Sequence, residues 1–228
     1  MTDYQTTTTH DLPQKTEVKY SPLRLIGILT LTAFCTVLLI VATFTRIKVL
    51  VCLYPIECIL HPSNVVDFAS VFALKPYFYI PQVPIILFTA VLLGAACCVT
   101  SVFFYIVIGL AFIPIFGLGG GFDYVIQPVF GYILGFIPAA LVAGGFTAKK
   151  RSIKNIFVAA FASVIVLHLT GFVYMLLVSL IKHESLSYIL DWLLYESLIR
   201  AVYDFFFGVI LMIIAKFFRK FIWILTSI

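Results

Sequence analysis

Few ionisable residues fall inside the long apolar stretches of this chain, and three of them could take part in binding or chemistry. Arg200 and Asp204 are four residues apart, so in a helix they lie one turn from each other on the same face. His168 lies in another apolar stretch with Gly171 and Tyr174 three and six residues further on, and a helix places all three on one stripe. Ionisable side chains inside a membrane are costly and mark candidate functional sites. The simpler alternatives are an arginine–aspartate pair that neutralises itself and a histidine that bonds to a nearby carbonyl.

A glycine-rich segment, FGLGGGFDYVIQPVFGY at residues 116–132, joins two of the apolar stretches. Glycine adopts backbone conformations closed to other residues, so such a loop can approach a ligand closely or swing. It is not a nucleotide-phosphate loop, because it lacks the lysine and the serine or threonine of that motif. A simple turn is the alternative, although four glycines exceed what a turn requires. We therefore expect residues 117–127 to form a gating loop with the glycines Gly117, Gly119, Gly120 and Gly121.

Further polar side chains in and beside the apolar stretches complete one candidate site. They come from stretches far apart in the chain, and we expect them to meet in the outer half of one bundle of helices, open to the outside. The candidate substrate-binding residues are Gln82, Tyr124, Gln127, Tyr132, His168, Tyr174, Arg200 and Asp204.

The composition indicates which elements must position these residues. Of the 228 residues, 63% are hydrophobic and only 11% are charged, and the mean hydropathy is +1.14. A soluble domain of this composition would lack the polar surface to cover itself. A spanning helix needs roughly 20 apolar residues, so the chain has room for about six of them. We predict an all-α integral membrane protein, a bundle of six transmembrane helices with no separate catalytic domain.

The apolar stretches and their charged flanks set the predicted spans within a membrane domain at residues 23–217. Residues 1–22 form a polar tail without the pattern of a cleavable signal, so the first apolar stretch is expected to be a retained helix. A long external loop follows at 46–80, and its apolar parts could hide an extra helix. The predicted spans are 23–45, 81–93, 99–116, 128–147, 155–181 and 197–217, with a turn at 94–98, a short interfacial helix at 186–196 and a tail at 218–228.

The distribution of charge gives this topology a direction. With these spans, ten of the fifteen basic residues and three of the ten acids lie on the side of the two termini. Because cytoplasmic loops carry an excess of lysine and arginine, we expect both termini to be cytoplasmic. The basic cluster at 149–154 and a second cluster at 216–220 contribute most of this excess.

The five cysteines are too few and too scattered for a disulfide framework or a zinc site, so we expect neither a metal nor a cofactor. Cys52 and Cys58 fall in the predicted external loop, where an oxidising compartment would permit a bridge; most cysteines are expected to be packing residues. Nothing in the chain indicates nucleic-acid binding.

The first apolar stretch carries small residues that let another helix pack closely, namely Gly27, Thr32, Ala33 and Thr36. They could receive a helix of a partner protein, or they could pack within the bundle itself. The sequence leaves both alternatives open.

Aromatic, glycine and proline residues recur through the segment from Pro76 to Gly145: Tyr105, Gly109, Pro114, Phe116, Gly119 to Gly121, Tyr124, Pro128, Gly131, Tyr132, Gly135 and Phe136. With these residues the segment resembles the third and fourth helices of the BioY family and the residues just before them. Gln82 falls on a glutamine that this family also carries, and Asp204 falls where its sixth helix has an aspartate.

The chain also departs from that family's pattern. The family's Gly-Pro-Thr-Gly-Gly-Tyr reads Gln-Pro-Val-Phe-Gly-Tyr at 127–132, which loses a threonine hydroxyl and brings an amide. The family's lysine one turn after the aspartate is Phe207 here, and Arg200 could replace its charge from the other side. Thr32 and Thr36 stand where the family's first helix has paired alanines.

The resemblance implies a substrate-capturing subunit of an energy-coupling-factor (ECF) transporter for biotin, in a bacterial inner membrane. Such a subunit is not an enzyme; ATP hydrolysis belongs to two ATPase subunits, which join it through a transmembrane coupling subunit, while lipid surrounds it. Asp204, Gln82 or Gln127 would accept from the ureido N–H groups of biotin. Two alternatives are a subunit for another small vitamin, and an intramembrane enzyme that uses Asp204 with His168, or Cys97 and Cys98.

Overall fold

The computed structural model describes residues 22–52 and 74–226. The helices are α1 (Pro22–Phe44), α3 (Gln82–Leu93), α4 (Ala95–Ala111), α5 (Phe130–Ala148), α6 (Ile153–Ile181), α7 (Leu186–Trp192) and α8 (Arg200–Thr226), with a short 3₁₀ helix η3 (Phe122–Ile126) and a π-helix η4 (Leu193–Ile199). Two strands, β1 (Ile47–Cys52) and β2 (Leu74–Tyr79), complete the described elements.

The predominantly helical architecture is as predicted, and several of its helices are long and apolar enough to cross a bilayer. In the described residues there are four such segments, Leu25–Phe44, Phe130–Ala148, Ile153–Ile181 and Leu186–Phe221. α3 and α4 have 12 and 17 residues, or about 18 Å and 26 Å at 1.5 Å per residue, less than the roughly 30 Å of a hydrocarbon core. They form an apolar pair that is broken at Gly94, whose φ of 93° is a left-handed value that favours glycine.

Several predicted boundaries were wrong. The turn between α3 and α4 is Gly94 alone rather than residues 94–98, and α4 ends at Ala111 rather than Phe116. The predicted interfacial helix at 186–196 is not separate, because α7, η4 and α8 follow one another without a break from Leu186 to Thr226. Lys216 and Lys220 therefore lie within α8 instead of ending it, since the apolar residues that follow continue the helical pattern.

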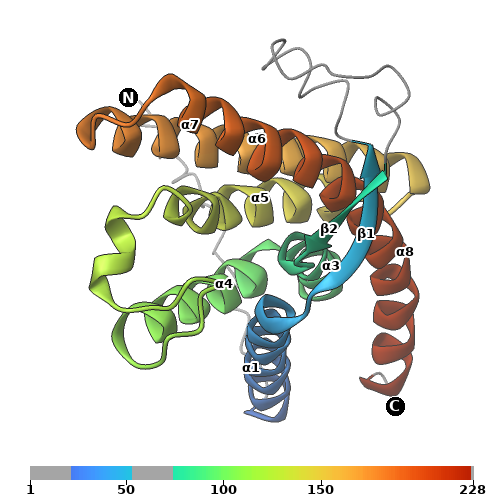
Figure 1. Cartoon of the computed structure of the whole chain (residues 1–228). Helices are drawn as coiled ribbons and strands as arrows, with labels where there is room; N and C mark the ends of the chain where they lie inside the picture. The colour runs from blue at the N-terminus through green and yellow to red at the C-terminus, as the bar shows by residue number, and fades with distance from the viewer. Residues whose placement is uncertain (1–21, 53–73, 227–228) are drawn as a thin grey trace, which may run out of the picture.

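A β-hairpin that the sequence analysis did not foresee lies in the predicted external loop. β1 and β2 pair antiparallel, with Ile47 opposite Tyr79 and Cys52 opposite Leu74. Tyr203 of α8 donates to the Leu50 carbonyl at 3.1 Å. Figure 1 shows the two strands of the hairpin beside the upper part of α8. The Cys52–Cys58 bridge and a helix within 53–73 lie outside the described residues, as do the tail at 1–21 and residues 227–228.

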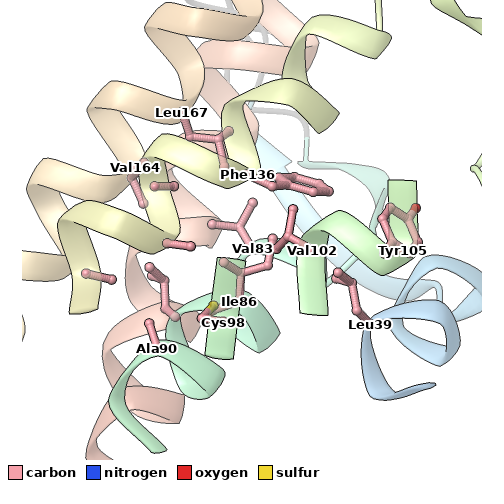
Figure 2. Close-up of a cluster of buried hydrophobic side chains, with 14 of the residues drawn as sticks. Leu39, Val83, Ile86, Ala90, Cys98, Val102, Tyr105, Phe136, Val164 and Leu167 are labelled. Atoms are coloured by element: carbon pink, nitrogen blue, oxygen red, sulfur yellow. The ribbon is translucent and has the colours of Figure 1, made fainter. Parts of the chain in front are cut away.

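The core lies where α3, α4, α5 and α6 meet. Figure 2 shows Val83 and Ile86 of α3 packed between Val102 of α4 and Phe136 of α5. Glycines allow the closest approach between α5 and α6: a Cβ on Gly131 would collide with Tyr174, and one on Gly171 with the Tyr132 ring. Each tyrosine thus occupies the space that a side chain at the facing glycine would need.

α8 holds both ends of the short helix α3. Arg200, the first residue of α8, donates to Gln82, the first residue of α3, at 3.1 Å. Arg219, near the other end of α8, donates to the carbonyls of Val91 and Leu92, where the last carbonyls of a helix have no partner within it. The two helices are thus tied at each end by an arginine.

Candidate functional site

A cavity of about 230 Å³ opens where the hairpin, the glycine-rich loop, α5 and the start of α8 meet. Its walls are mainly aromatic and aliphatic, with a few polar and charged groups, as in many small-molecule sites. The lining residues are Arg46, Phe78, Ile80, Gln82, Gly117, Leu118, Tyr124, Val129, Tyr132, Ile133, Phe136, Trp192, Glu196 and Arg200.

Arg200 is the main charged group of the cavity, and its guanidinium is fixed on three sides. It is 8% exposed, its Nη1 donates to Glu196 Oε2 at 2.9 Å, and its Nη2 donates to Gln82 Oε1 at 3.1 Å. Its Nε lies 3.9 Å from Asp204 Oδ2. A guanidinium held in this way presents its donors in a fixed direction, which favours recognition of a carbonyl or carboxylate.

Gln82 joins this guanidinium to two other helices. Its Nε2 donates to Thr43 Oγ1 of α1 at 2.9 Å and to the Tyr105 hydroxyl of α4 at 3.0 Å. Because the bond from Arg200 uses the amide oxygen, the orientation of the amide is set by all three partners. Gln82 lines the cavity as predicted in sequence, while Thr43 and Tyr105 were missed, since neither is close to it in the chain.

Asp204 lies behind the cavity and not on its wall. It is fully buried, the Tyr79 hydroxyl donates to its Oδ1 at 2.6 Å, and His168 Nε2 lies 3.1 Å from its Oδ2. Burial raises the pKa of Tyr79, and the Asp204 carboxylate raises it further, so this hydroxyl stays protonated and donates. His168 Nδ1 is buried and has no partner among the described residues. The predicted grouping of Arg200, Asp204 and His168 therefore exists, but Asp204 and His168 do not line the cavity.

The end of α7 and the π-helix η4 bring residues to the cavity that were not among the predicted site residues. Trp192 and Glu196 line the wall, and Ser197 shares a 2.6 Å hydrogen bond with the Tyr132 hydroxyl, which fixes that ring. π-helical turns are rare and often occur at functional sites. The spacing of Glu196, Arg200 and Asp204, each four residues after the last, was a signal that could have revealed Glu196.

The remaining predicted binding residues divide into two groups. Tyr124 and Gly117 line the cavity. Gln127 is exposed and does not line it. Tyr174 does not line it either; its hydroxyl donates to the Val125 carbonyl in the segment after the glycines. Gly119 and Gly121 have left-handed φ values of 127° and 88°. Gly120 packs so closely on Pro114 and the Gly109 carbonyl that a Cβ would collide with both. The loop is thus anchored on the end of α4.

The small residues of α1 point in different directions. Thr32 and Thr36 are buried against α4, where the Ser101 hydroxyl donates to the Thr32 carbonyl at 3.1 Å. Gly27 and Ala33 are exposed. Of the two cysteines considered for chemistry, Cys98 is buried and donates to the Ile86 carbonyl, while Cys97 is partly buried.

The apolar helices, and the cavity that they enclose with the hairpin and loops, define a multi-pass membrane protein with a site for a small molecule. Residues 65–223 match the sequence profile of the BioY family, and the chain belongs to that family. The resemblance found in the sequence is confirmed.

Two known proteins are similar to the chain. A probable biotin transporter BioY of Lysinibacillus sphaericus is 38% identical over 93 residues, which cover 37% of this chain and 47% of that relative. The chain therefore matches about half the length of that relative. A crystal structure of the S-component for biotin from an ECF-type ABC transporter has a TM-score of 0.63 at 18% identity, over 89% of this chain and 95% of that one, and the two share their fold.

Proposed function

We propose that this chain is the biotin-binding, substrate-specific subunit of an ATP-driven ECF uptake system in a bacterial cell membrane. The observation that carries the proposal is the cavity of this BioY-family chain, whose lining combines the Arg200 guanidinium with the aromatic rings of Tyr124, Tyr132 and Trp192. A transport subunit of this kind is not an enzyme, and both similar proteins are named for biotin.

The lining matches the chemistry of biotin. Biotin has a ureido group with two N–H donors and a carbonyl, an apolar ring system and a flexible chain that ends in a carboxylate. The described lining has two cations, Arg200 and Arg46. Glu196 is bonded to Arg200 and would repel a carboxylate there. We therefore assign the ureido carbonyl to Arg200 and the ligand carboxylate to Arg46, with the aromatic residues and Phe136 as walls.

The six crossings with both termini in the cytoplasm belong to the same proposal. The shared fold with an S-component supports them, as does the excess of lysine and arginine that α5, α6 and α8 place at one end. On this topology the hairpin and the glycine-rich loop face the outside, where the nutrient arrives. The glycine-rich loop would then control access to the cavity.

A transmembrane coupling subunit and two ATPase subunits would supply the energy. We assign the exposed side of α1 with Gly27 and Ala33 to the coupling subunit, because small residues let a second helix approach. Thr32 and Thr36 are already used within the bundle by Ser101. Co-purification of the chain with and without Ala33→Trp would test this surface.

The proposal is tested by calorimetric titration of the purified chain in lipid nanodiscs with biotin and a panel of other vitamins. We expect saturable binding of biotin alone. A matched control is Glu184→Gln, which removes one acidic charge at an exposed position outside the cavity and leaves binding unchanged. Binding of a different vitamin would replace biotin in the proposal, and binding of none would reject it.

A further inference from the structure

Two acidic residues of the α7–α8 helix could meet a ligand, and the structure separates their environments. Asp204 is fully buried, and its two oxygens contact Tyr79 and His168. The Glu196 side chain is 28% exposed and lies on the cavity wall. A ligand that enters the cavity therefore reaches Glu196 first, whereas it would have to displace Arg200 or Tyr79 to touch Asp204.

The π-helical geometry sets the place of Glu196. Trp192, Glu196 and Arg200 all line the cavity, and all lie within η4 or directly beside it. The wider turn of a π-helix changes the face on which side chains emerge relative to a regular helix. Asp204, one regular turn after Arg200, emerges away from the cavity.

Glu196 and Arg200 together form an acceptor beside a donor. The 2.9 Å bond between Arg200 Nη1 and Glu196 Oε2 holds the two groups side by side. A carboxylate has about four lone-pair positions, so this bond leaves Glu196 able to accept further hydrogen bonds. A ureido group carries N–H donors beside a carbonyl acceptor and is complementary to this arrangement.

We propose that Glu196 is the residue that accepts the ureido N–H groups of biotin, and that Asp204 is a positioning residue that holds Tyr79, His168 and Arg200 behind the cavity. This inference rests on the proposed function, since it assigns the substrate contact within the same cavity. It assigns the carboxylate that contacts the ureido group to Glu196 in η4, whereas the sequence pointed to Asp204.

The test compares Glu196→Gln with Asp204→Asn in three measurements: biotin affinity, melting temperature, and the ureido N–H proton resonances of bound ¹⁵N-labelled biotin. A carboxylate acceptor moves such a resonance downfield. We expect Glu196→Gln to weaken binding roughly 10- to 100-fold, to keep the melting temperature and to lose the downfield shift. If Glu196→Gln folds poorly, Glu196→Asp serves as the second variant. It keeps the negative charge and should retain the downfield shift.

Asp204→Asn should lower the melting temperature, because a buried carboxylate with two partners is altered, and the biotin that remains bound should keep its downfield resonance. Two outcomes would overturn the inference: unchanged affinity in Glu196→Gln, or loss of the downfield resonance in Asp204→Asn with an unchanged melting temperature. In either case, biotin binding by the wild type would still uphold the proposed function. Absence of biotin binding in the wild type would overturn both.

Discussion

Gln82 and Arg200 are 118 residues apart in the chain and are joined by a hydrogen bond of 3.1 Å from Nη2 to Oε1. This bond connects the first residue of α3 with the first residue of α8. Through Thr43 and Tyr105, the same glutamine also holds α1 and α4. The cavity wall therefore depends on one amide that four helices share.

Gln82→Ala should weaken both the fold and the site. The substitution leaves the buried Arg200 Nη2 group without the Gln82 acceptor, which costs about 1–3 kcal/mol of unfolding free energy, while the Tyr105 hydroxyl keeps its bond to Thr43. Biotin affinity should fall at least tenfold, as measured by calorimetry beside a thermal melt. Asn155→Ala removes an amide that bonds to the Lys150 carbonyl outside the cavity, and it should leave affinity unchanged.

Gly171→Ala should damage the cavity through packing alone. A Cβ at this position would collide with the Tyr132 ring, so Tyr132 must move at a cost of about 1–3 kcal/mol. We expect weaker biotin binding and a lower melting temperature. Gly145→Ala is the matched control, because nothing lies within 4 Å of its Cβ and alanine favours a helix by up to about 1 kcal/mol. Equal effects of the two substitutions would contradict the close packing of α5 on α6.

Trp192 should report ligand binding by its fluorescence, because its side chain lines the cavity. The chain has two tryptophans, and the other, Trp223, lies near the end of α8. Biotin should change the emission of the wild type and of Trp223→Phe but not that of Trp192→Phe. A response that persists in Trp192→Phe would place the ligand elsewhere.

Arg46→Gln should weaken biotin about tenfold or more, as expected for the loss of a hydrogen bond to a charged group. The affinity for biotin methyl ester, which lacks the carboxylate, should be the same in the variant and the wild type. Lys48→Gln removes a cation two residues further on, at an exposed position outside the cavity, and serves as the control. A similar loss for the acid and the ester would mean that Arg46 acts on the fold instead.

Much of the fold follows from the length of the apolar stretches and their charged flanks. α1, α5 and α6 begin and end within a few residues of their predicted bounds, because a helix in an apolar medium must satisfy its backbone internally. The hairpin could not be predicted in this way, since β1 and β2 are short, lie more than twenty residues apart and owe their place partly to Tyr203 on a distant helix.

Half of the eight residues predicted to bind the substrate line the cavity, and their contact with a ligand stays a prediction. Arg200, Gln82, Tyr124 and Tyr132 were expected at a ligand and line the cavity. The direction of Asp204 is set by Tyr79 and His168, which come from the hairpin and from α6, so no local pattern could reveal it. Glu196 was assigned to an interfacial helix because the continuity of α7, η4 and α8 is not visible in composition.

The two arginine ties between α3 and α8 limit how the site can move. Because Arg200 and Arg219 hold α3 at its first residue and at its last carbonyls, α3 and α8 are joined at both ends of α3. A rearrangement that opens the inner side must move these two helices as one body or break a charged hydrogen bond at one end. The hairpin is bonded to α8 through Tyr79 and Tyr203, whereas the glycine-rich loop is bonded to Gly109 of α4, so the two segments beside the cavity would follow different helices.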